Sequence, residues 1–329
     1  MIRQIFDMQQ VDDMDEFNGA AYDYLLLAPN IEKRSRASFL KWRDQGIFNK
    51  VVVMDYANFH KEITNEQEDT FYDDFKGVTI IHLKVSSEMD AVRQLCKLGI
   101  ESDKNIAIDI TGFSIPNIYG VIGALKNVVK IRHLDIYYTE PRFYIYEEGY
   151  FDAYHKKIKE RHCAPVIGYC NSGEDEKEIL TIFLGFDGGL ADMVYFKLGE
   201  EGKEILQTLV VNGFPSYTVK LKDVSLFNNE DLINKIEKEN VLCSAANNPF
   251  ETYNLLCKIL KKYEGILLNL CTIGSKPMAL GTCLFALDYG DKVKVTYPFY
   301  EKTQFDTDEE PGKIWRYGVD FQTGEFAFL

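Results

Sequence analysis

The sequence predicts an α/β protein with two tandem Rossmann-like copies, each a doubly wound, mainly parallel sheet, and a small C-terminal β-hairpin. Three observations lead to this prediction. The chain has 329 residues, more than the roughly 100–200 residues of a typical domain. Short apolar runs alternate along it with amphipathic stretches, which is typical of buried parallel strands connected by helices. Segments of the first half also recur, in the same order, in the second half.

The duplication is carried by four pairs of segments. Leu25–Pro29 corresponds to Thr181–Phe186, Val51–Tyr56 to Thr208–Gly213, Ile106–Leu125 to Ile266–Leu287, and Ile131–Tyr138 to Val293–Phe299. Within the third pair, Ser114, Pro116 and Gly120 match Ser275, Pro277 and Gly281 at a constant offset of 161. Matches in the same order indicate a repeated unit. We therefore expect copy one at residues 1–150, a connecting segment at 151–178, and copy two with the hairpin at 179–329.

The elements of each copy follow from local patterns. Continuous apolar strands are expected at Leu25–Ala28, Val51–Met54, Ile106–Ile110 and Ile266–Leu270, and helices at Arg34–Gln45, Glu88–Leu98, Pro116–Lys126, Glu230–Glu239, Pro249–Lys262 and Pro277–Leu287. Ser114 and Ser275 each precede a proline by two residues, which is a helix-start signature. At the C-terminus, Lys313–Phe321 and Glu325–Leu329 flank a Thr-Gly turn, and we expect them to form the hairpin.

The composition excludes some partners. The chain holds 37 Lys and Arg against 51 Asp and Glu, for a net charge of −14. Binding of duplex nucleic acid depends on cationic side chains that neutralise phosphates, so we expect no duplex nucleic acid partner.

Cysteine spacing and hydropathy indicate the cellular compartment in which the protein is expected. The seven cysteines are dispersed without a C-x-x-C pair, which predicts free thiols in a reducing compartment and no bound zinc or other metal. Met1–Gly19 lacks the pattern of a signal peptide, and the apolar stretch Ile266–Leu287 is interrupted by Asn269 and Gly281. We expect a cytoplasmic protein without membrane contact and without a cofactor.

Candidate ligand-binding residues of copy one follow its predicted strands. Ligands of open parallel sheets bind beyond the carboxyl ends of the strands. The residues at these places are Asn30, Arg34, Arg36, Asp55, Thr111 and Ser114. Arg34 and Arg36 have the chemistry of a clamp for phosphate or carboxylate, although a solvated first helical turn would have the same sequence. Asp55 has the chemistry of an acid or base, and equally of a helix cap.

Copy two contains candidate ligand-binding residues in a more specific pattern. Its strand-end residues are Asp187, Gly188, Asn212, Thr272, Gly274, Ser275 and Lys276. The run T-I-G-S-K places hydroxyl groups and a lysine at a predicted helix N-terminus, where backbone N–H groups favour an anion. A helix cap with a purely folding role is the alternative. We expect Lys276 and Arg34, supported by Arg36, to face one cleft.

The strand followed by T-I-G-S-K-P-M-A-L-G resembles the corresponding turn of CRISPR-associated Rossmann-fold (CARF) sensor domains. The resemblance implies that Gly274, Ser275 and Lys276 contact a cyclic oligoadenylate. It also implies that the loops Asn30–Arg36 and Phe186–Gly189 line the same groove. Copy one departs from the pattern, because Ile115 stands where copy two has Lys276.

These observations favour a protein that binds a small anionic ligand, nucleotide-derived or otherwise phosphorylated, such as a nucleotide or cyclic oligonucleotide. By the resemblance it would be a sensor or accessory subunit of prokaryotic antiviral defence, with a protein partner in a defence complex. One alternative is an enzyme of phosphodiesterase or glycosidase type acting in the cleft between the copies. A second is a non-catalytic scaffold for a partner protein. The motifs H-E-x-x-H and G-x-S-x-G do not occur, so no catalytic residue is assigned and enzymatic turnover stays open.

Overall fold

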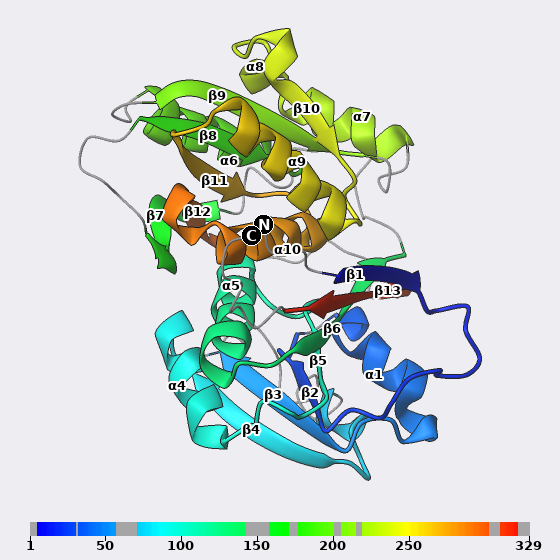
Figure 1. Cartoon of the computed structure of the whole chain (residues 1–329). Coiled ribbons are helices and arrows are strands. Elements are labelled where there is room, and N and C mark those ends of the chain that lie inside the picture. Colours follow the sequence, from blue (N-terminus) through cyan, green and yellow to red (C-terminus); the bar gives the residue numbers. More distant parts are fainter. Residues whose placement is uncertain are drawn as a thin grey trace. The chain divides into compact units, whose positions relative to one another are not determined.

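The computed structural model describes residues 5–30, 32–56, 71–142, 158–170, 177–200, 205–214, 219–302 and 310–321. The chain forms two compact units. Unit 1 consists of residues 1–145 and 307–329, and unit 2 of residues 146–306. Each unit is built on one mostly parallel sheet with helices on both faces, so the predicted doubly wound α/β fold class is confirmed (Figure 1).

Unit 1 contains a seven-stranded sheet with the order β1-β13-β6-β5-β2-β3-β4. The strands are β1 (Ile5–Gln10), β2 (Tyr24–Leu27), β3 (Lys50–Tyr56), β4 (Thr79–Val85), β5 (Ile106–Asp109), β6 (His133–Pro141) and β13 (Pro311–Asp320). Strands β2 to β6 run parallel, β13 is antiparallel to β6, and β1 is antiparallel to β13. The helices are η1 (Lys33–Arg36), α1 (Ala37–Trp42), η2 (Arg43–Gln45), α4 (Glu88–Leu98), α5 (Ile115–Ala124) and η3 (Leu125–Val129). Figure 1 shows α1 on one face of this sheet and α4 with α5 on the other.

Unit 2 contains a six-stranded sheet with the order β10-β9-β8-β11-β12-β7. The strands are β7 (Ile158–Cys170), β8 (Glu178–Phe183), β9 (Ile205–Gly213), β10 (Val241–Ser244), β11 (Leu267–Thr272) and β12 (Val293–Lys302). The helices are α6 (Gly188–Val194), η6 (Tyr195–Glu200), α7 (Val219–Asn228), α8 (Glu230–Ile233), η7 (Lys238–Asn240), α9 (Pro249–Lys262), α10 (Lys276–Asp288) and η8 (Gly290–Lys292). The long helices α9 and α10 lie side by side (Figure 1).

The two sheets repeat one topology. Reading from β4, unit 1 has the order β4-β3-β2-β5-β6-β13, and unit 2 matches it strand for strand as β10-β9-β8-β11-β12-β7. The four segment pairs found in the sequence therefore occupy equivalent strands and helices. Ser114 caps α5 after β5, and Ser275 caps α10 after β11, so the two serines stand at equivalent helix starts.

The central strands are apolar because both of their faces are covered. Every residue of β5 and β11 is buried, as are all but the first residue of β2 and β8 and all but the two end residues of β3. In an antiparallel sheet with one wet face such runs would alternate with polar residues, so the uninterrupted pattern reflects helices on both sides.

The C-terminal strand corrects one expectation. Strand β13 exists, but it pairs with β6 and β1 in unit 1 and does not extend copy two. The second strand of the expected hairpin, Glu325–Leu329, lies outside the described residues. The connecting segment 151–178 also contributes structure, because β7 within it forms the antiparallel edge of the second sheet.

The helix expectations hold with local changes. Glu88–Leu98 and Pro249–Lys262 have the predicted bounds, whereas the predicted helix Arg34–Gln45 is divided among η1, α1 and η2. The predicted helix Glu230–Glu239 is reduced to the short α8, and α6 and α7 were not predicted. No helix in the described ranges has the length and hydropathy needed to cross a membrane.

Candidate functional site

In both units the loops that follow the first and fourth parallel strands touch backbone to backbone. A Cβ on Gly112, after β5, would lie 2.0 Å from the carbonyl oxygen of Ala28, after β2. In unit 2 the glycine lies in the loop after the first strand and not in the loop after the fourth. A Cβ on Gly185, after β8, would lie 2.3 Å from the carbonyl oxygen of Ile273, after β11. These strand pairs form the topological switch point, where Rossmann-type sheets bind ligands. This backbone contact leaves no room for a ligand between the two loops. A ligand at this edge of the sheet would therefore lie beyond the loops.

Buried hydrogen bonds join the polar residues at the carboxyl edge of unit 1. Asp109 is fully buried, accepts a hydrogen bond from the Thr111 backbone N–H at 2.9 Å, and accepts another from the Ser38 hydroxyl. The Thr111 hydroxyl accepts from the Thr139 backbone N–H at 2.9 Å. Thr111, a predicted ligand residue, therefore ties the ends of β5 and β6 together.

The two arginines after β2 are buried and already paired with carboxylates. Arg34 is 8% exposed, its Nε lies 2.5 Å from Glu32 Oε2, and its Nη1 donates to the Thr139 carbonyl at 3.0 Å. Arg36 is 4% exposed, forms an ion pair with Asp74, and lies over the Phe71 ring. Neither arginine belongs to a solvated helical turn. Their charges are balanced inside unit 1, and their predicted use as an anion clamp stays a prediction.

The remaining predicted residues of unit 1 also have local partners. The Asn30 side chain accepts a hydrogen bond from the Glu32 backbone N–H at 3.0 Å. Ser114 caps α5 by accepting from the Asn117 N–H at 3.4 Å. Asp55 is buried at the end of β3 and does not cap a described helix.

In unit 2 a second polar network surrounds the end of β8. The Ser225 hydroxyl on α7 lies 3.0 Å from the Gly185 carbonyl oxygen and 2.9 Å from Asn212 Oδ1. The Asn229 amide donates to the Gly185 carbonyl at 3.0 Å. Asn212, a predicted ligand residue at the end of β9, therefore serves to bind α7 to the sheet.

Three strand-end loops converge on the start of α10. Ser275 caps this helix by accepting from the Met278 N–H at 3.3 Å, and its hydroxyl donates to the Ala246 carbonyl in the loop after β10. On the other side, a Cβ on Gly274 would lie 2.8 Å from the Leu184 carbonyl oxygen in the loop after β8. Lys276, the first residue of α10, is half-buried. The helix start thus combines a cation with a polar N-terminus at the carboxyl edge of the sheet.

The other predicted residues of unit 2 have structural contacts. Asp187 caps α6 by accepting from the Leu190 N–H at 2.9 Å. Gly188 lies against α7, because a Cβ there would come within 1.6 Å of the Asn228 carbonyl oxygen. The buried Thr272 hydroxyl lies 3.1 Å from that of Thr282 on α10.

Sequence reasoning missed a charged network on β6 and β13. Asp135 is 6% exposed, and its carboxylate accepts from the Tyr22 hydroxyl at 2.6 Å. His133 Nε2 lies 3.4 Å from Asp135 Oδ1, and Arg316 Nε lies 3.8 Å from the same oxygen. His133 Nδ1 also lies 2.6 Å from Asp320 Oδ1. The available signal was the even spacing of His133 and Asp135 on β6 and of Arg316 and Asp320 on β13, since an even spacing places both residues of a pair on one sheet face.

The network shifts the pKa values of its members. Hydrogen bonds to Asp135 and then to Asp320 raise the pKa of His133 to about 9, against an opposing effect of burial. Burial acts to raise the pKa of Asp135, but the hydrogen bonds from His133 and Tyr22 and the charge of Arg316 lower it below the ordinary value. Near neutral pH the site therefore holds an ionised carboxylate between two cations.

We expect the stability of unit 1 to fall as the pH rises from about 6.5 to about 9. His133 has a pKa of about 9 when folded, above its ordinary value of 6.5, so its stabilising effect is complete below pH 6.5 and is lost as the pH rises through 9. The full pKa shift corresponds to about 3 kcal/mol in the free energy of unfolding. Because the His133 side chain is 43% exposed, solvent screening reduces this contribution to about 1 kcal/mol. Urea unfolding read by tryptophan emission measures this in unit 1, where Trp42 and Trp315 both lie. His133→Gln should flatten the pH dependence, and an equal slope in both proteins would contradict the assignment.

Among the described residues, thiols and metal-ligand clusters offer no other site. All seven cysteines are free. Within the described ranges, no three His, Cys, Asp or Glu side chains are grouped in a way that would hold a metal ion.

Comparisons with known proteins show no family for this chain. No family model and no curated protein matches it. Similar solved structures include a candidate universal stress protein from Pseudomonas aeruginosa, with 11% identity, coverage of 84% of this chain and 94% of that chain, and a TM-score of 0.26. The cytoplasmic domain of a prokaryotic cation chloride cotransporter has 10% identity, coverage of 87% and 98%, and a TM-score of 0.26. The GsuK channel bound to NAD has 9% identity, coverage of 88% and 62%, and a TM-score of 0.23.

Proposed function

We propose that the protein binds a small phosphorylated ligand of nucleotide type at the carboxyl edge of the unit 2 sheet. The observation that carries the proposal is the convergence of three strand-end loops on the start of α10, where Lys276 stands beside the Ser275 cap. The amides of a helix N-terminus and a lysine together favour a phosphate group. The 13-residue length of α10 supports a full helix dipole at this point.

The asymmetry between the units supports a single site of this kind. Unit 1 has Ile115 at the position of Lys276, and its arginines Arg34 and Arg36 pair with Glu32 and Asp74. The ligand of unit 2 therefore does not depend on these arginines. The resemblance of the α10 turn to CARF sensors extends the proposal to a cyclic oligonucleotide as the ligand and to a sensor or accessory role in antiviral defence.

We expect Lys276→Ala to weaken ligand binding roughly 10- to 150-fold, because a charge-assisted hydrogen bond contributes about 1.5–3 kcal/mol. Ser275→Ala should cost less, since the backbone N–H groups of the helix start remain. The measurement is calorimetry with a panel of nucleotides and cyclic oligoadenylates, chosen after mass spectrometry of any ligand that copurifies with the native protein.

Lys292→Ala is the matched control. Lys292 is an exposed lysine in η8, directly before β12 and therefore at the amino edge of the same sheet. It should leave the affinity unchanged. If Lys276→Ala bound the same ligand as tightly as the wild type, the α10 start would be a helix cap with no binding role.

A further inference from the structure

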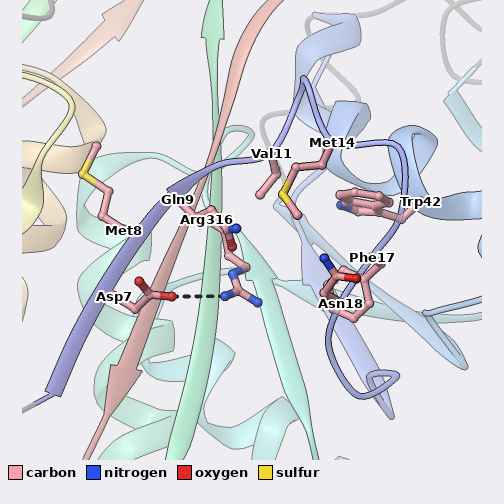
Figure 2. Close-up of a pocket in the computed structure, with 9 residues that line it drawn as sticks. All are labelled: Asp7, Met8, Gln9, Val11, Met14, Phe17, Asn18, Trp42 and Arg316. Carbon is pink, nitrogen blue, oxygen red and sulfur yellow. Dashed lines mark hydrogen bonds and ion pairs between the residues drawn. The ribbon is translucent and has the colours of Figure 1, made fainter.

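Unit 1 contains a pocket of about 500 Å³ beside β1, and none of the residues predicted to bind a ligand lines it. The residues that line it are Asp7, Met8, Gln9, Val11, Met14, Phe17, Asn18, Trp42 and Arg316 (Figure 2). They come from β1, the segment that follows it, α1 and β13. Its volume lies in the range of about 300–1,000 Å³ that is usual for small-molecule sites.

A buried hydrogen-bond donor faces this pocket. Trp42 is fully buried, and its Nε1 has no hydrogen-bond partner among the described residues. Figure 2 shows the edge of the indole that carries this nitrogen turned toward Met14 and the pocket interior. A buried N–H without an acceptor costs about 1–3 kcal/mol. A ligand with a carbonyl or ring-nitrogen acceptor would remove that cost.

Arg316 supplies further donors and Asp7 a matching acceptor. Arg316 Nη2 donates to Asp7 Oδ2 at 3.2 Å, and the Asp7 side chain is 64% exposed. Such an exposed ion pair contributes little by itself and is easily rearranged by a ligand. The side-chain amides of Gln9 and Asn18 add both donors and acceptors to the lining.

The charge around the pocket selects against anions. Arg316 already lies between Asp7 and Asp135. The segment from Val11 to Asn18 carries four carboxylates, Asp12, Asp13, Asp15 and Glu16, against one nearby cation, Lys41, which donates to the Asp12 carbonyl. The walls formed by Val11, Met14 and Phe17 are apolar. A phosphate group would meet this acidic surface, whereas an uncharged ring with polar edges would not.

We propose that this pocket binds an uncharged, planar heterocycle with donor and acceptor groups at its edge, of the nucleobase or nucleoside class. The ring contacts Met14 and Phe17, an acceptor on the ring receives the Trp42 N–H, and a donor on the ring reaches Asp7. This site lies wholly in unit 1 and does not depend on the phosphate site proposed at Lys276.

Trp42 makes the proposal measurable. The chain has two tryptophans, so Trp315→Phe leaves Trp42 as the single reporter. Titration of this variant with adenosine, guanosine, cytidine and uridine should give a saturable change in emission with at least one nucleoside. The 5′-monophosphate of that nucleoside should bind at least tenfold more weakly, because of the surrounding carboxylates.

Two neighbouring positions on β1 provide a matched pair of variants in the same background. Gln9→Phe should fill the pocket and weaken nucleoside binding at least tenfold. Gln10→Phe should leave binding unchanged, since Gln10 is the next residue along β1 and is not part of the pocket lining. Asn18→Phe, at an exposed position of the lining, tests occlusion again if Gln9→Phe disturbs the strand.

The outcomes separate this proposal from its alternatives. The proposal is supported if Gln9→Phe and Asn18→Phe abolish the saturable emission change and Gln10→Phe retains it. No saturable change with any of the four nucleosides, tighter binding of the monophosphate, or full binding by both occluding variants would overturn it. None of these results bears on Lys276, whose ligand is measured by calorimetry in unit 2.

Discussion

Gly281→Ala is expected to destabilise unit 2 by about 2–3 kcal/mol, although alanine is the better helix former. Gly281 lies within α10, and a Cβ there would come within 2.3 Å of the Pro249 carbonyl oxygen and 2.7 Å of the Thr252 Cβ. Both contacts are with the first turn of α9. The intrinsic preference for alanine over glycine contributes about 1 kcal/mol in favour of the variant. Overpacking against a backbone oxygen costs more, because neither helix can give way without leaving the sheet.

Native-state hydrogen exchange of the β11 amides measures this loss within unit 2 alone. Gly290→Ala is the control, since nothing lies within 4 Å of a Cβ at that position and its φ is not positive. It should change the free energy of opening by less than about 0.5 kcal/mol. Protection in Gly281→Ala equal to or above that of the wild type would mean that α9 and α10 are not packed as closely as the structure has them.

The same contact bears on the proposed ligand site. The close approach of α9 and α10 fixes the distance between the loop after β10 and the start of α10, where Ser275 donates to the Ala246 carbonyl. Separation of the helices would disturb that hydrogen bond. A weaker ligand affinity in Gly281→Ala would therefore arise without any change at Lys276.

Much of the fold was accessible from the sequence because its information is local. The apolar runs of β2, β3, β5 and β11 identify strands without reference to their partners. The two serine-to-proline helix starts also act within one turn of helix. Repetition of these local signals at a nearly constant offset was sufficient to predict the duplicated topology.

The partner of β13 was not accessible in this way. It lies between β1 and β6, but its own sequence is that of a strand that would suit either sheet. The pairing that decides the question joins Trp315 to Tyr138 and to Gln10, across most of the chain. Local hydropathy carries no information about such a distant choice.

In the candidate site, too, local features could be predicted from the sequence, whereas pairings between distant residues could not. The position of Ser275 and Lys276 at a helix start follows from their own segment. The pairing of Arg36 with Asp74 joins residues 38 positions apart, and that of His133 with Asp320 joins residues 187 positions apart. Whether a charged side chain is available to a ligand depends on such partners, so the sequence indicated cations at strand ends without revealing which ones are already neutralised.

Asp135→Ala is expected to destabilise unit 1 by about 3 kcal/mol. The substitution leaves the Tyr22 hydroxyl, His133 and Arg316 without their shared acceptor in a nearly buried position. Removal of one partner from a buried ion pair typically costs about 3–5 kcal/mol, and partial exposure of His133 and Arg316 places this case at the lower end. Asp135→Asn keeps an acceptor for Tyr22 and should cost less. Tryptophan emission during urea unfolding measures both variants in unit 1.

The pH profile distinguishes loss of charge from loss of packing. The lowered pKa of Asp135 means that its contribution is present above the ordinary carboxyl pKa and is lost as the pH falls through the folded value. The raised pKa of His133 means that its contribution is lost as the pH rises through about 9. The difference in stability between the wild type and Asp135→Asn should therefore be greatest between about pH 4 and 6.5 and smaller on both sides. Asp320→Asn, at a half-exposed position where the carboxylate pairs with His133, should cost less than about 1 kcal/mol. A difference between wild type and Asp135→Asn that stayed constant from pH 3 to pH 10 would show that Asp135 acts through its shape and not through its charge.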